Sequence, residues 1–136
     1  MGRSIVAVVV GFVVIAALSL GTDLALKSLL PGLFTAAGRT DDVAILVLVL
    51  LYVGVYATFG CWLAARLAPS RPMRHAIVLG LLGLAFNVMG TIAAWDTAPR
   101  WYHLTALALV MLWAWLGGYI RERQLARRAG APAFAA

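Results

Sequence analysis

Four apolar runs without Asp, Glu, Lys or Arg constrain this chain more than any other feature of its sequence. They cover residues 4–22, 43–65, 76–95 and 101–120. Each is close to the ~20 residues that an α-helix needs to cross a hydrocarbon core about 30 Å thick. Because a bilayer interior offers no water to backbone groups, such runs must be helical or form a closed barrel. The runs lack the polar–apolar alternation of barrel strands, so we predict four transmembrane helices.

The composition agrees with a membrane protein. Of the 136 residues, 64% are hydrophobic and 12% are charged, whereas a soluble domain carries about 25% charged residues. We therefore predict an all-α, polytopic membrane protein with one compact four-helix domain over residues 1–120. Residues 121–136 are expected to form a basic cytoplasmic tail that is partly disordered.

Basic residues are divided unevenly between the two sets of flanking segments. Residues 23–42 and 96–100 carry three, Lys27, Arg39 and Arg100. The other flanks carry eight: Arg3, Arg66, Arg71, Arg74, Arg121, Arg123, Arg127 and Arg128. Since cytoplasmic loops of membrane proteins are enriched in Lys and Arg, this asymmetry predicts that both termini are cytoplasmic.

The stretch ARLAPSRPMRHA, residues 65–76, is predicted to be the cytoplasmic turn between the second and third helices. Ser70 is expected to cap the third helix, with Pro72 in its first turn, where a missing N–H costs little. The arginines form no continuous stripe and no patch interleaved with aromatic residues, so we expect no nucleic-acid partner. We expect contact with anionic lipid headgroups instead, from Arg66, Arg71, Arg74, Arg121 and Arg123.

The two halves of the chain resemble each other. Residues 7–22 align with 76–91 at one constant offset, and the second and fourth runs align at another. The alignment pairs four sets of small or basic residues, Gly11 with Gly80, Gly21 with Gly90, Gly60 with Gly117 and Arg66 with Arg123. This pattern predicts a parallel two-helix repeat, related by an axis along the membrane normal.

Small residues recur at spacings of three or four within the runs, which brings them onto common helix faces. Such faces let helix backbones approach closely inside a membrane. We predict that helix packing uses Gly11, Gly21, Gly60, Gly80, Gly83, Gly90, Gly117 and Gly118. Asn87 is the most polar side chain well inside a run, and we expect its amide to bond a neighbouring helix, with Ser19 and Thr58 as further intramembrane polar groups.

No motif for catalysis, metal binding or a cofactor is present, and we predict none of the three. The single Cys61 has no intrachain partner, and no Cys/His spacing matches a metal site. The central parts of the runs hold no carboxylate or basic side chain, which argues against a proton-coupled exchanger. Asp23, Asp96 and His103 would be plausible acid–base groups if they converged at the outer end, although a solvated surface is the favoured interpretation.

A family resemblance rests on ARLAPSRPMRHA, on Gly80, on WDTAPRWY at residues 95–102 and on AWLGG at residues 114–118. With these features the chain resembles a group of small, uncharacterised bacterial four-helix integral membrane proteins. The resemblance covers most of the chain beyond residue 43. It implies a multi-pass protein of the bacterial inner membrane and carries no functional residue across.

The sequence therefore favours a non-enzymatic integral membrane protein that self-associates or serves as an accessory to another membrane component. Two alternatives stay open. One is a small channel or transporter whose pathway lies between protomers, near Asn87, Tyr52 and Tyr56. The other is a membrane enzyme that uses Asp23, Asp96 and His103.

Overall fold

The structure, a computed structural model, describes residues 2–35 and 39–130. It is all-helical over this part of the chain and contains four α-helices. They are α1 (Gly2–Leu29), α2 (Val43–Leu67), α3 (Pro72–Ala93) and α4 (Arg100–Ala129), with short 3₁₀ turns η1 (Pro31–Leu33) and η2 (Trp95–Thr97). All four helices are long and apolar enough to cross a membrane. The predicted class, a multi-pass membrane protein with four packed helices, is confirmed.

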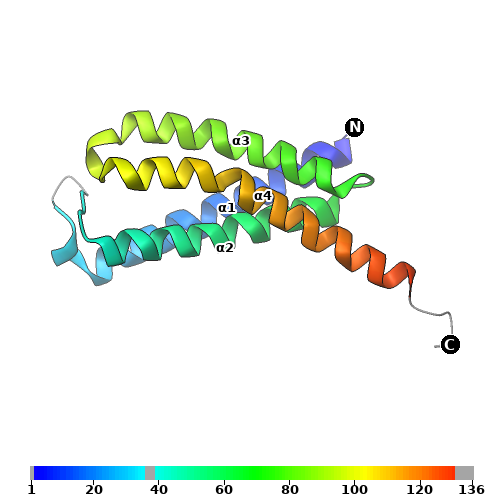
Figure 1. The fold of residues 1–136 in the computed structure, drawn as a ribbon, viewed down its shortest axis with the longest axis horizontal. Coiled ribbons are helices and arrows are strands. Elements are labelled where there is room, and N and C mark those ends of the chain that lie inside the picture. The colour runs from blue at the N-terminus through cyan, green and yellow to red at the C-terminus, as the bar shows by residue number, and fades with distance from the viewer. Residues whose placement is uncertain (1, 36–38, 131–136) are drawn as a thin grey trace.

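The helices run alternately up and down (Figure 1). The start of α1, the α2–α3 turn and the end of α4 lie at one end of the bundle, which we call the terminal end. Residues 30–35, 39–42 and 94–99 lie at the opposite end, which we call the connector end. Because α1 and α3 point the same way, the topology agrees with the predicted repeat of two helix pairs.

Two helices are longer than their apolar runs. α1 continues to Leu29 and so carries Asp23 and Lys27 on the helix rather than in a loop. α4 continues to Ala129, roughly 14 Å beyond residue 120, and this extension projects away from the bundle (Figure 1). Much of the predicted tail is therefore helical, and the disorder predicted for its end falls on residues 131–136, which lie outside the described residues.

The α2–α3 turn differs from its predicted cap. The residue before α3 is Arg71, which adopts the left-handed conformation with φ 48° and makes no side-chain capping bond. Pro72 occupies the first turn, as predicted. The carbonyl of Arg71 lies 3.2 Å from a ring nitrogen of His75 one turn later. The turn therefore reverses the chain through a strained backbone position, not through a Ser70 cap.

The centre of the bundle is built mainly from small side chains. The buried cluster consists of Cys61, Ala64, Ala65, Ala76, Leu79 and Ala114. Leu79, 1% exposed, is the largest of the fully buried side chains. Since lipid tails are as apolar as leucine, association of helices in a membrane depends on close packing of this kind.

Five of the eight glycines predicted to pack lie at helix contacts. A Cβ on Gly11 would lie 2.7 Å from the carbonyl oxygen of Gly60, so α1 and α2 touch through their backbones. Gly117 meets the α2 backbone at Thr58, Gly80 meets Ala114, and Gly118 meets Met73 and Ala76. By contrast, Gly21, Gly83 and Gly90 have nothing within 4 Å of a Cβ. Their predicted packing role is wrong, because no other part of the described chain comes close to them, and Gly90 lines a cavity instead of a helix contact.

The two helix pairs share one side-chain arrangement. The Arg66 guanidinium lies 5.2 Å from the ring of Trp62 on α2, and Arg123 lies 5.0 Å from the ring of Tyr119 on α4. These residues are equivalent under the offset that aligns the second and fourth runs. The repeat stays a prediction, and this shared cation–π contact supports it.

Candidate functional site

A cavity of about 430 Å³ opens at the connector end, where all four helices contribute to its wall. Its volume falls within the range of about 300–1,000 Å³ that is typical of small-molecule sites. Apolar residues such as Leu46, Leu50 and Trp113 form much of the wall. The polar side chains that line it are Asp23, Lys27, Thr40, Asn87, Thr91, Thr97, Tyr102 and His103.

Asp23 is held in the cavity by the second helix. The hydroxyl of Tyr52 donates a hydrogen bond to Asp23 Oδ1. One turn later the hydroxyl of Tyr56 lies 3.0 Å from Thr22 Oγ1, and the centroids of the two tyrosine rings lie 5.7 Å apart with the planes tilted by 44°. Two successive turns of α2 therefore bond two consecutive residues of α1, which fixes the position of the carboxylate.

Asp23 lies below the rim of the bundle. Its partner Tyr52 is nine residues into α2, roughly 14 Å along the helix from Val43. Ionisable side chains within membrane-spanning helices commonly mark a site for a ligand, an ion or a proton. The central parts of the four apolar runs hold no carboxylate, but the extension of α1 beyond its run adds a partly buried one, Asp23, at the connector end of the bundle.

No cation pairs with Asp23 among the residues that the structure describes. The ion pair found within them joins Arg39 to Asp41 at 3.3 Å, in an exposed loop. Lys27 follows Asp23 by one helical turn and is exposed at the rim of the cavity. The carboxylate thus faces the cavity with one hydrogen bond from Tyr52 and without an ammonium or guanidinium group within 4 Å.

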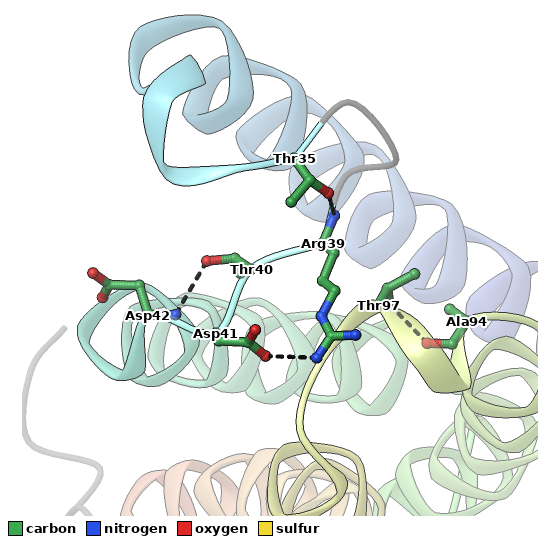
Figure 2. A network of polar contacts seen from close by, with 7 residues as sticks. All are labelled: Thr35, Arg39, Thr40, Asp41, Asp42, Ala94 and Thr97. Atoms are coloured by element: carbon green, nitrogen blue, oxygen red, sulfur yellow. Dashed lines mark hydrogen bonds and ion pairs between the residues drawn. The ribbon is translucent and has the colours of Figure 1, made fainter.

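The connecting segments close one side of the cavity through the polar network in Figure 2. The backbone N–H of Thr40 donates to the Thr97 carbonyl at 3.2 Å, which ties the α1–α2 segment to the α3–α4 segment. Asp41 pairs with Arg39 (Figure 2). Asp42 caps α2 by accepting from the Ile45 N–H at 3.0 Å. These two carboxylates are occupied in the loop, and neither lines the cavity.

His103 lies at the cavity wall and is 5% exposed. Its ring stacks on Trp95 at 5.4 Å, with 15° between the planes. Tyr102 approaches the same ring edge-on at 5.6 Å. The Nε2 atom is buried without a hydrogen-bond partner among the described residues. A buried ring nitrogen in that state is a candidate to bond whatever occupies the cavity, since an unmet polar group costs free energy.

Asn87 also lines the cavity. No hydrogen bond in the described residues joins its amide to Ser19, Thr22 or Thr58; Thr22 pairs with Tyr56 instead. Ser19 Oγ is buried without a partner, and Thr58 meets Gly117 through its backbone. The predicted interhelical bond of Asn87 is thus not formed, and its amide borders the cavity.

The predicted group of Asp23, Asp96 and His103 comes together only in part. Asp23 and His103 line one cavity, whereas Asp96 is exposed in η2 outside the lining. Within residues 2–35 and 39–130 no three His, Cys, Asp or Glu residues are grouped to hold a metal ion. Cys61 is buried in the core.

The predicted headgroup arginines lie at the terminal end, far along the helices from this cavity. They are Arg66 at the end of α2, Arg71 in the turn, Arg74 in the first turn of α3, and Arg121 and Arg123 on α4. Four are exposed, whereas Arg121 is partly buried and its Nε has no partner in the described residues.

Sequence reasoning missed the pairing of Tyr52 and Tyr56 with Asp23 and Thr22. The sequence contains the elements of this pairing. Tyr52 and Tyr56 lie one helical turn apart in the second run, and that run is antiparallel to the first, which ends at Thr22-Asp23. Comparison with protein-family models, with curated proteins and with solved structures gave no match for this chain.

Proposed function

We propose that this is a multi-pass protein of the bacterial inner membrane with both termini in the cytoplasm. The terminal end carries the eight basic residues counted above, and the connector end carries three. The positive-inside rule then directs the terminal end to the cytoplasm and the cavity to the outer side.

Within that membrane, we propose a non-enzymatic binding role: the cavity at the connector end takes a small molecule that carries an ammonium group. The observation that carries this proposal is Asp23, a partly buried carboxylate in the cavity wall that makes no ion pair within 4 Å among the described residues. An ammonium group on a ligand would supply such a partner, since an opposite charge at short range favours the ionised carboxylate.

The rest of the wall suits an organic cation. Tyr102 and Trp113 offer aromatic faces, to which cations are attracted. Asn87 and Thr91 offer oxygen acceptors for the remaining N–H groups. The alternative of catalysis by Asp23, Asp96 and His103 needs Asp96 as a second acid. Because Asp96 does not line the cavity, a binding role is favoured over catalysis.

The proposal includes association with a second copy or with another membrane protein. Ala17 and Gly21, four residues apart on α1, are both exposed, and Gly21 has open space where a Cβ would stand. A partner helix can approach this face of α1 closely.

The binding proposal is tested by ligand-dependent stability of the full chain in detergent. Benzylamine, benzyl alcohol and benzoate share one ring and differ in charge, and each is titrated while thermal unfolding is followed by tryptophan fluorescence. Benzylamine is expected to raise the unfolding temperature, and the other two are expected to have little effect. A ligand that binds the folded state and not the unfolded state raises the free energy of unfolding, and the increase grows with the ratio of ligand concentration to Kd.

Asp23→Asn is the informative variant, because the amide oxygen still accepts from Tyr52 while the charge is lost. It is expected to abolish the benzylamine shift and to leave the unliganded protein folded. Asp96→Asn removes the same charge at the same end outside the cavity and serves as the matched control. Equal shifts for benzylamine and benzyl alcohol, or an unaltered shift in Asp23→Asn, would refute the proposal.

A further inference from the structure

A second groove runs between α2 and α4 toward the terminal end, with a volume of about 650 Å³. Its wall is almost wholly apolar and includes Val55, Phe59 and Trp62 from α2 and Leu109, Leu116 and Ile120 from α4. From Leu50 to Trp62 it extends roughly 18 Å along α2. This length exceeds the ~15 Å of hydrocarbon in one leaflet, half of a core about 30 Å thick.

The terminal end of the groove is polar and basic. Trp62 Nε1–H donates to Gln124 Oε1 at 3.0 Å, which leaves the Gln124 amide nitrogen as a further donor. A small pocket lined by Tyr119, Arg123, Gln124 and Arg127 adjoins the groove, with which it shares Ile120 and Gln124. Arg66 stacks on Trp62, so its guanidinium lies beside the same end.

Arg123 and Arg127 line the pocket that adjoins the groove, and Arg66 lies over Trp62 in the groove wall, so three guanidinium groups lie near the terminal end of this apolar groove. Arg66 and Arg123 are held over aromatic rings at 5.2 and 5.0 Å. Glu122 is the neighbouring carboxylate on α4, but no ion pair joins it to an arginine in the described part of the chain. This end of the groove thus has a positive charge that the protein itself leaves uncompensated.

We propose that this groove binds one anionic phospholipid, with an acyl chain between α2 and α4 and the phosphate among Arg66, Arg123 and Arg127. Guanidinium groups bind phosphate through paired, charge-assisted hydrogen bonds. The apolar groove excludes a wholly polar anion, and the three arginines favour a negative headgroup over a zwitterionic one. The site is independent of the cavity at the connector end.

The other apolar groove at the terminal end fits a lipid less well. It lies between α1 and α3, has a volume of about 300 Å³ and is bordered by Arg74 and His75. It holds one guanidinium group and lacks an aromatic ring that would fix it. The difference identifies which of the predicted headgroup arginines form a site, namely Arg66 and Arg123, joined by Arg127.

Native mass spectrometry of the full chain in detergent tests the proposal with two lipids that differ only in headgroup. Dioleoyl phosphatidylglycerol is expected to remain bound as a single copy and dioleoyl phosphatidylcholine to bind at least tenfold more weakly. Arg66→Gln with Arg123→Gln should weaken phosphatidylglycerol binding by about fivefold for each arginine. Arg3→Gln with Arg71→Gln removes the same charge from the same end and should leave binding unchanged.

A groove-filling pair separates acyl-chain binding from headgroup attraction. Val55→Trp places a larger side chain in the groove and should weaken binding of both lipids, while Val47→Trp, on an exposed face of α2 outside the groove, should not. Equal binding of the two lipids, equal losses in both arginine pairs, or equal binding of soluble glycerol phosphate would each overturn the proposal.

Discussion

The hydroxyl of Tyr52 on α2 donates a hydrogen bond to the carboxylate of Asp23 on α1. This contact is made inside the bundle, and the same carboxylate borders the cavity at the connector end. One bond thus contributes both to the packing of two helices and to the placement of the charge on which the proposed function depends. Binding at the cavity and association of α1 with α2 are therefore expected to be linked.

Tyr52→Phe should lower stability more than Tyr56→Phe. The first change removes a bond to a charged acceptor, worth about 2 kcal/mol, and the second removes a neutral bond worth about 1 kcal/mol. Both variants keep the ring, so the tilted ring contact at 5.7 Å is preserved. Thermal unfolding in detergent measures the difference, and equal losses would mean that Asp23 does not depend on Tyr52.

Gly60→Leu should destabilise the bundle by about 3 kcal/mol, because overpacking displaces neighbours that cannot move freely. A Cβ there would meet the side chain of Ile15 and lie 2.8 Å from the Gly11 carbonyl oxygen. Gly90→Leu is the matched control: the space around Gly90 is open, so stability should change by less than about 0.5 kcal/mol.

Gly21→Leu separates packing within the chain from association between chains, because Gly21 is exposed on α1 with open space where a Cβ would stand. If this face of α1 carries the contact with a second copy, the substitution should shift the protein toward monomer in size-exclusion chromatography with light scattering. An unfolding temperature of Gly21→Leu that falls as far as that of Gly60→Leu would contradict the open environment of Gly21.

His103→Phe should raise the stability of the unliganded protein by about 1 kcal/mol. The phenyl ring can keep the stack on Trp95, while the buried Nε2 without a partner is removed. Ligand binding at the cavity should weaken at the same time if Nε2 bonds the ligand. Thermal unfolding with and without benzylamine measures both effects, and a less stable variant would indicate that Nε2 is already satisfied.

Cysteine labelling should place the two ends of the bundle on opposite sides of the membrane. Ser70→Cys lies in the α2–α3 turn and Asp96→Cys in the α3–α4 connection, both exposed. An impermeant maleimide added to intact cells should modify position 96 and leave position 70 unmodified until the cells are opened. The native Cys61 is 2% exposed and should not react in either case. Modification of position 70 in intact cells would reverse the proposed orientation.

The helices themselves could be predicted because lipid imposes a simple length and composition on each crossing. The end of α1 could be predicted only as one of two alternatives, an extension of the first run or a separate short interfacial helix, because Asp23 and Lys27 interrupt the apolar pattern; the structure shows the extension, to Leu29. Only the tertiary structure shows that Asp23 turns toward Tyr52 rather than toward water. The cavity followed from that contact and was therefore not predicted.

The glycine pattern identified close contacts without identifying every partner. Gly11 and Gly60 lie on faces that meet, while Gly90 has a similar sequence environment but borders the cavity, with no described atom within 4 Å of its Cβ position. Spacing specifies which residues share a face, but the rotation of a helix about its axis depends on all its neighbours. For this reason the face of α3 that carries Gly83 and Gly90 could not be placed from the sequence.

Leu79 is the largest fully buried side chain, and the other members of its buried cluster are alanines and a cysteine, with glycines at the closest helix contacts. An interior of this kind reverses the usual pattern of mutational tolerance. Substitutions that add a few carbon atoms at the helix contacts should lower stability even when the new side chain is apolar. Lipid-facing positions should tolerate large apolar side chains. In a complete substitution scan, the loss of stability at central positions should therefore increase with side-chain volume.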